Sequence, residues 1–219
     1  MPHQQDPLSK TEISLAAATV HNSAGLDESA WFETISLDEA RTHDTGERAA
    51  HICCYEPSSN RTFTGIVLLQ TGTLDSWQHI EGAQARILPE EFVIACNLAR
   101  EDPAFIEALT ARGIDDPSKV LIESWAAGNF GVPQEEGLRI AYGHCWLIND
   151  AGDNPYARPI ANLHPVFDLA AGKILRIDDY GAVPIPPDPG PIRRKEQRTD
   201  VKELQITQPD GPSFTVDGY

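Results

Sequence analysis

The sequence predicts an α+β protein made of two units, each with one or two helices followed by an antiparallel sheet. A capped helical stretch precedes several short segments in which apolar residues alternate, and the same order recurs in the second half of the chain. Helices and strands are grouped rather than alternating one by one, which distinguishes α+β from α/β proteins. A length of 219 residues suits two small domains with a core in each.

The first unit opens with a helix predicted from about Pro7 to Asn22. Ser9 can accept hydrogen bonds from free backbone N–H groups at the helix start, and Glu12 favours the first turn. Segments with period-two hydrophobicity then predict strands at 31–37, 49–56, 63–69 and 74–79. Their connections are short, so an antiparallel meander is the simplest arrangement.

The second unit opens with two consecutive helices. The first starts at Pro89 and the second ends near Gly113, with Asp102 and Pro103 between them. Strands are predicted at 120–125, 138–149, 164–169 and 173–177. The similarity between the two halves is too weak to make them a true sequence repeat.

A Pro-rich segment, Val183–Pro191, marks the end of the second unit. It lacks the backbone donors that a sheet needs, and its fixed φ angles favour an extended linker. We therefore predict domains at 1–86 and 87–183, followed by a linker and the start of a further domain at 184–219. The basic cluster Arg193–Lys195 has two interpretations, a contact with an acidic neighbour or an ordinary solvated stretch.

Composition argues against several classes of function. The formal net charge is −16, whereas nucleic acids and anionic membrane surfaces are bound by clustered Lys and Arg. No apolar run reaches the roughly 20 residues of a membrane helix, and the polar N-terminus does not resemble a signal peptide. Four cysteines are too few for a disulfide scaffold, and the adjacent Cys53 and Cys54 are interpreted as small buried hydrophobes. We expect an intracellular protein.

Catalytic motifs are missing from the sequence. The seven histidines lack the spacing of metal-ligand pairs on a strand or helix, and no phosphate loop, dinucleotide fingerprint or nucleophile elbow occurs. Asp178 and Asp179 are adjacent in a predicted strand and so point to opposite faces, which prevents paired acid–base chemistry. The sequence therefore predicts no catalytic residue, no bound cofactor and no metal site in this chain.

Three aromatic residues, Phe92, Trp125 and Tyr156, are the candidate functional residues. Phe92 follows two glutamates, and Trp125 and Tyr156 lie in loop-like contexts, where large rings line sites or pack over neighbours. Ordinary core or interface packing is the alternative for all three.

Six stretches in a fixed order, covering essentially the whole chain, support a family assignment: 6–13, 89–92, 115–117 with 120–122, 124–131, 152–159 and 205–216. They include Asp6-Pro-Leu-Ser9, Ser124-Trp-Ala-Ala-Gly-Asn-Phe-Gly131 and Gln205-Ile-Thr-Gln-Pro-Asp-Gly-Pro212. Together they resemble the N-terminal part of the copper-containing primary amine oxidases, whose topaquinone cofactor is made from one of their own tyrosines. The resemblance implies two cystatin-like domains, N2 and N3, followed by the start of a truncated catalytic β-sandwich.

The same resemblance implies where the chemistry lies. Family members use an Asn-Tyr-Asp/Glu motif for the quinone, three histidines for copper and a separate aspartate as base, and this chain contains no Asn-Tyr pair. Copper and topaquinone are therefore expected in the full-length family and not in this chain, which we expect to be inactive alone. By motif position, Phe92, Trp125 and Tyr156 resemble N3 residues on the wall of the substrate channel.

The implied partners are a primary amine and oxygen, and the implied assembly is the family's homodimer. The cytoplasm and the peroxisome both stay open as compartments. An alternative reading is a stand-alone, non-catalytic binding or dimerisation module from a truncated gene.

Overall fold

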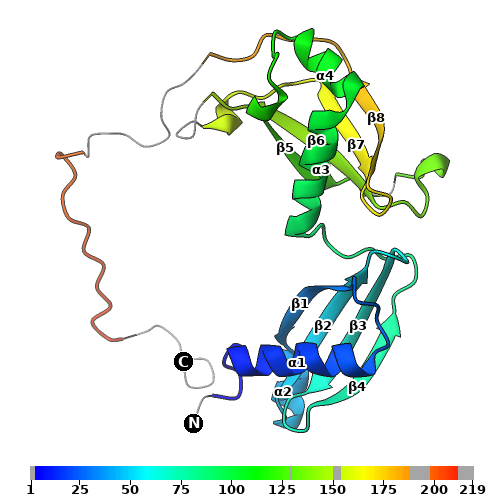
Figure 1. Ribbon diagram of the computed structural model, residues 1–219. Coiled ribbons are helices and arrows are strands. Elements are labelled where there is room, and N and C mark those ends of the chain that lie inside the picture. Colours follow the sequence, from blue (N-terminus) through cyan, green and yellow to red (C-terminus); the bar gives the residue numbers. More distant parts are fainter. Residues whose placement is uncertain (1–2, 129, 150–153, 188–197, 212–219) are drawn as a thin grey trace.

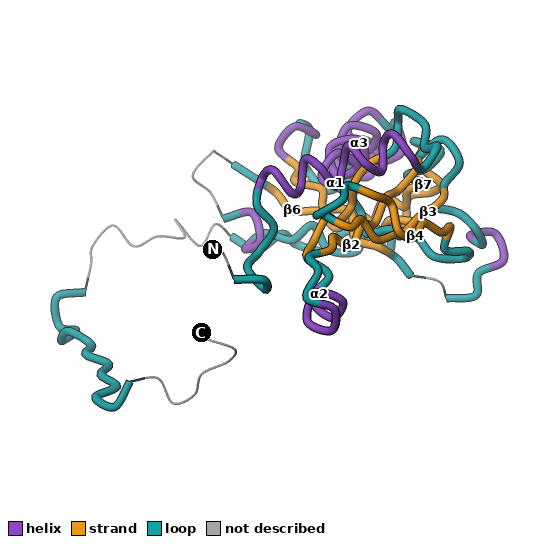
Figure 2. Tube along the Cα trace, turned by 90° about the horizontal axis from the view of Figure 1, so that it is seen from below, coloured by secondary structure: helices purple, strands orange, loops and turns teal. Residues whose placement is uncertain are grey.

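The computed structural model describes residues 3–128, 130–149, 154–187 and 198–211. It contains two four-stranded antiparallel sheets, with strand orders β1-β2-β3-β4 and β5-β6-β7-β8 (Figure 1). Helices pack on each sheet, which confirms the predicted α+β class. Helices α1 and α3 lie on the same side of the two sheets, and α2 lies on the other (Figure 2).

Helix α1 (Lys10–Ser23) begins after Ser9, three residues later than predicted. Ser9 is the N-cap, so Pro7 and Leu8 precede the helix, and the Glu12 side chain completes a reciprocal capping box. Arg48 also binds Glu12, with Nε 2.7 Å from Oε1. This hydrogen bond lowers the pKa of Glu12 to about 2 and ties the helix start to the sheet.

The first sheet consists of β1 (Trp31–Leu37), β2 (Ala49–Glu56), β3 (Arg61–Leu68) and β4 (Thr73–His79). Its core forms where Ala16 and Val20 of α1 pack with Ile52, Cys54 and Val67 of the sheet. Cys54 is buried with these residues and its neighbour on β2 is partly exposed, as alternation along a strand requires.

Helix α2 (Glu39–Thr45) was not predicted. The Asp38 side chain caps its start, and Gly46 ends it with a φ of 73°. Of its seven residues only Thr42 is buried, so the segment lacks the apolar periodicity that reveals a helix in a sequence.

The second unit contains α3 (Pro89–Glu101) and α4 (Pro103–Thr110), with Asp102 ending one helix and capping the next. Its strands are β5 (Val120–Ala126), β6 (Ile140–Leu147), β7 (Leu163–Asp168) and β8 (Lys173–Asp179). Short 3₁₀ turns occupy Pro117–Lys119, Pro133–Glu135 and Pro155–Ala157. Ala95, Ala99 and Phe105 of the helices pack with Ile122 and Phe167 of the sheet to form the larger core.

Beyond β8 the described residues contain no helix or strand. The second half of the Pro-rich linker and the basic cluster Arg193–Lys195 lie outside the described residues, as do residues 212–219 of the predicted β-sandwich start. The boundaries 1–86, 87–183 and 184–219 therefore stay predictions. None of the described helices has the length and apolar character needed to cross a bilayer.

Candidate functional site

Aromatic and imidazole rings cover the face of the second sheet that the helices leave open. Tyr142, His144 and Trp146 alternate along β6 and therefore share this face, because successive strand residues point to opposite sides. Trp125 from β5 meets His144 with ring centroids 5.1 Å apart. His164 from β7 lies 5.3 Å from His144 and 5.1 Å from Tyr142.

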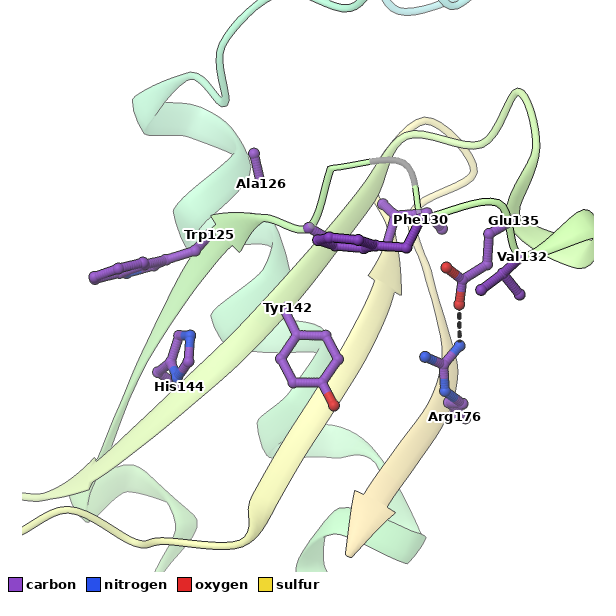
Figure 3. Close-up of a pocket in the computed structure, with 10 residues that line it drawn as sticks. Trp125, Ala126, Phe130, Val132, Glu135, Tyr142, His144 and Arg176 are labelled. Atoms are coloured by element: carbon purple, nitrogen blue, oxygen red, sulfur yellow. Dashed lines mark hydrogen bonds and ion pairs between the residues drawn. The ribbon is translucent and has the colours of Figure 1, made fainter.

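A pocket of about 410 Å³ opens beside these rings (Figure 3). This volume lies within the range of sites for small organic molecules. Phe130 lies above Tyr142 in the close-up, and the ion pair between Glu135 and Arg176, at 2.5 Å, stands at one side. The lining is mostly apolar and consists of Trp125, Ala126, Ala127, Phe130, Val132, Glu135, Ile140, Tyr142, His144 and Arg176.

Two of the three sequence-predicted residues meet at one carboxylate. Glu123 accepts hydrogen bonds from Trp125 Nε1 at 3.4 Å and from the Tyr156 hydroxyl. The bond to Glu123 raises the pKa of Tyr156, so this hydroxyl stays protonated and acts as a donor. Trp125 and Tyr156 are 57% and 58% exposed, which leaves both rings available for contact.

Phe92 does not join this group. It lies on α3, which packs on the opposite face of the sheet, and its side chain is 38% exposed. The assignment of Phe92, Trp125 and Tyr156 to the wall of a substrate channel stays a prediction, and the structure brings only Trp125 and Tyr156 together, at Glu123.

The neighbouring aspartates on β8 point to opposite faces, as their adjacency in a strand predicts. Asp178 accepts a hydrogen bond from the Tyr142 hydroxyl at 2.7 Å, on the face with the rings. Asp179 instead binds Arg112 of the helical layer at 2.6 Å, and that hydrogen bond lowers its pKa to about 2. Burial, together with the bond to Asp178, raises the pKa of Tyr142, so Tyr142 is a neutral donor at physiological pH.

Burial lowers the pKa of His144, and the nearby His164 adds to this effect. Glu123 acts in the opposite direction and is the weaker influence. A neutral imidazole at His144 adds no charge of its own to the surrounding rings at neutral pH.

We expect the low pKa of His144 to make the fold less stable in mild acid. The ordinary pKa is 6.5 and the folded value lies below it, so the unfolded chain binds more protons as the pH falls below 6.5. The free energy of unfolding should therefore decrease between about pH 7.5 and about pH 5.5, and less steeply in His144→Gln. Urea unfolding at both pH values measures the difference. His43→Gln, at an exposed imidazole on α2, is the control; a pH dependence in His144→Gln equal to that of the parent chain would contradict the expectation.

Sequence reasoning missed Tyr142, His144 and His164. Tyr142, His144 and Trp146 do carry a usable signal, because ring residues at every second position of a predicted strand share one face. The contact of His144 with His164 carries no such signal, since it depends on how β6 and β7 are placed side by side.

The residues present do not fit a copper or quinone centre. Within the described residues no group of three or more His, Cys, Asp or Glu side chains is placed to hold a metal ion. The sequence also has no Asn-Tyr pair. We therefore derive no chemical step from the ring-covered face, which consists of Trp125, Tyr142, His144, Trp146 and His164.

Comparisons with known proteins point to one family. The family model "Copper amine oxidase, N3 domain" matches residues 90–194. A primary amine oxidase of Arthrobacter sp. (strain P1) is 37% identical over 99% of this chain and 35% of its own length. A histamine oxidase of Arthrobacter globiformis is 31% identical over 99% of this chain and 33% of its own length.

A solved structure shows the same fold. The crystal structure of a copper-containing benzylamine oxidase from Hansenula polymorpha matches 99% of this chain and 38% of its own, with a TM-score of 0.70 and 20% identity. The chain thus spans about a third of the length of the relatives it matches. Residues 90–194 thus match the N3 domain of copper amine oxidases, and nearly the whole chain is similar to part of several primary amine oxidases.

Proposed function

We propose that this chain forms one wall of the substrate channel of a copper- and topaquinone-dependent primary amine oxidase. The complete enzyme would convert a primary amine, water and oxygen to an aldehyde, ammonia and hydrogen peroxide. The observation that carries the proposal is the exposed pair Trp125 and Tyr156, held around Glu123 beside an apolar pocket. The catalytic groups would lie outside these residues, so we expect the chain alone to be inactive.

The ring-covered face can contribute to amine binding in two ways. Trp125 and Phe130 can remove water from the apolar tail of an amine, which favours larger and aromatic substrates. An ammonium group near a ring face gains on the order of 1–2 kcal/mol by cation–π attraction when it is desolvated. The name of one relative, a histamine oxidase, fits an amine that carries a ring, whereas another relative, a copper methylamine oxidase, is named for an amine without one.

Assembly and location follow as further parts of the proposal. The complete protein would act as a homodimer inside the cell, in the cytoplasm or the peroxisome. All four cysteines are free thiols in the structure, as in proteins of reducing compartments.

We expect Trp125→Ala in the complete oxidase to change amine preference. Loss of the ring should lower kcat/KM for benzylamine relative to methylamine by about tenfold, the equivalent of about 1.4 kcal/mol. Peroxide release from each amine at several concentrations measures the ratio. Ile13→Ala, at an exposed position of α1, is the matched control, and a ratio in Trp125→Ala equal to the control's would refute the channel-wall role.

A stand-alone, non-catalytic binding or dimerisation module is the second candidate. The exposed rings of Trp125, Phe130 and Tyr156 favour it, because large exposed aromatic groups commonly mark interaction surfaces. The gene sequence beyond residue 219 separates the two candidates. A continuing reading frame with an Asn-Tyr-Asp motif and copper-binding histidines supports the oxidase, and a stop codon supports the module.

A further inference from the structure

Arg139 is a buried cation where the two units meet. It directly precedes β6, and only 2% of it is exposed. Its guanidinium faces the connection between β4 and α3, the first turn of α3 and the end of β2. One side chain thus contacts three segments that belong to different parts of the fold.

The contacts use most of the donors of the guanidinium. Arg139 Nε and Nη2 donate to the two carboxylate oxygens of Glu91 at 2.6 and 2.7 Å. Nη1 donates to the Ala85 carbonyl at 2.8 Å, and Nη2 also reaches the Arg86 carbonyl at 2.9 Å. The guanidinium carbon lies 4.2 Å from the ring centroid of Tyr55, which is 1% exposed. Only the planar guanidinium group of an arginine, with several N–H donors in fixed directions, can make all of these contacts together.

The residues just before Arg139 strengthen the same junction. Asn60, in the turn between β2 and β3, donates to the Gly137 carbonyl at 2.9 Å. Gln84, in the connection, donates to the Leu138 carbonyl at 2.9 Å. Each residue from Gly137 to Arg139 therefore makes a hydrogen bond either to the first unit or to the connection.

We propose that Arg139 is a positioning residue that fixes the orientation of the first unit relative to the second. Its guanidinium donates hydrogen bonds to the backbone carbonyls of Ala85 and Arg86 in the connection, and it packs over the ring of Tyr55 in the first sheet. Because Arg139 leads directly into β6, the same contacts set where the strand with the ring-covered face begins. This role is independent of the channel-wall function and holds for residues 1–219 by themselves.

Trypsin offers a direct test, because the connection contains its own cleavage site at the Arg86–Ile87 bond. The Arg86 side chain is 79% exposed, whereas its carbonyl is held by Arg139. We expect Arg139→Lys, which keeps the charge and loses the planar guanidinium group, to speed cleavage after Arg86 at least about tenfold. Arg176→Lys makes the same chemical change at an exposed ion pair and should change this rate less than twofold.

Tyr55 provides a second pair of variants. Tyr55→Leu removes the ring under the guanidinium and should also speed cleavage at Arg86. Tyr55→Phe keeps the ring and loses only the hydroxyl bond to Asn60 Oδ1, so it should speed cleavage less than Tyr55→Leu. Equal acceleration at Arg48 and Arg100 would show general loosening of the fold and would overturn the proposal. A cleavage rate at Arg86 unchanged in folded Arg139→Lys would overturn it as well.

The orientation itself can be measured between labels on the two units. Spin labels attached by non-cysteine chemistry at exposed positions Glu47 and Lys173 report the distance between the sheets. We expect a broader distance distribution in Arg139→Lys than in the parent chain and in Arg176→Lys. The same narrow distribution in all three proteins would show that Arg139 does not set the orientation.

Discussion

Phe105→Ala lowers the free energy of unfolding of the second unit by about 3–5 kcal/mol, which is the range for removing a fully buried aromatic side chain. Phe105 of α4 is 0% exposed and packs in the core with residues of α3 and the second sheet. The ring leaves a cavity that small neighbours such as Ala95 and Ala99 cannot fill. The helix itself should persist, because its cap is the bond from the Phe105 backbone N–H to Asp102, which the substitution keeps.

Urea unfolding followed by tryptophan fluorescence measures this loss, since Trp125 and Trp146 report on the second unit. Phe92→Ala is the matched control, because that ring is 38% exposed on the neighbouring helix and its loss should cost less than about 1 kcal/mol. A loss in Phe105→Ala no larger than in Phe92→Ala would mean that α4 does not hold the core together as the packing indicates.

The elements that the sequence predicts well are those with a periodic pattern of apolar residues. Strands β1 and β2 match their predicted bounds, although six of the eight residues of β2 are buried and every residue of β1 is at least partly exposed. Helix α2 was missed for the opposite reason, since a helix with one buried residue leaves no periodic signal. Helix α1 was placed three residues early because Pro7 is also compatible with a helix start, whereas the capping role predicted for Ser9 agrees with the structure.

The candidate site was predictable only in part. Trp125 and Tyr156 were identified from their loop-like sequence contexts and from resemblance to a family. Their meeting point at Glu123 was not predicted, because the two rings reach it from separate segments. The contact of His144 with His164 joins residues of different strands, which no spacing rule for a single strand or helix describes. Arg139 lacked any signal, since a lone arginine between two strands usually indicates exposed surface.

Gly143→Ala is expected to disturb both stability and the ring-covered face, because no side chain fits at this position. A Cβ atom on Gly143 would lie 2.6 Å from Cγ and 2.9 Å from the carbonyl oxygen of Pro165 on β7. Proline has no backbone N–H, and the pairing of β6 with β7 extends from Ile140 to Tyr142 and stops before Gly143. Strand β6 would have to move away from β7, at a cost of up to about 3 kcal/mol for such overpacking.

The displacement should reach the imidazoles, because the ring of His164 is bonded to the Gly143 carbonyl at 3.0 Å and packs on His144. We therefore expect the His144 and His164 side-chain signals in NMR spectra to shift in Gly143→Ala, along with the loss of stability in urea. Ser124→Ala is the sharpest control, since Ser124 pairs with Gly143 from β5 and is equally buried. The Ser124 hydroxyl has no hydrogen-bond partner among the described residues, so its removal should be neutral or slightly stabilising. If Gly143→Ala were as stable as Ser124→Ala, the close approach of β6 to Pro165 could not be what holds the two histidines together.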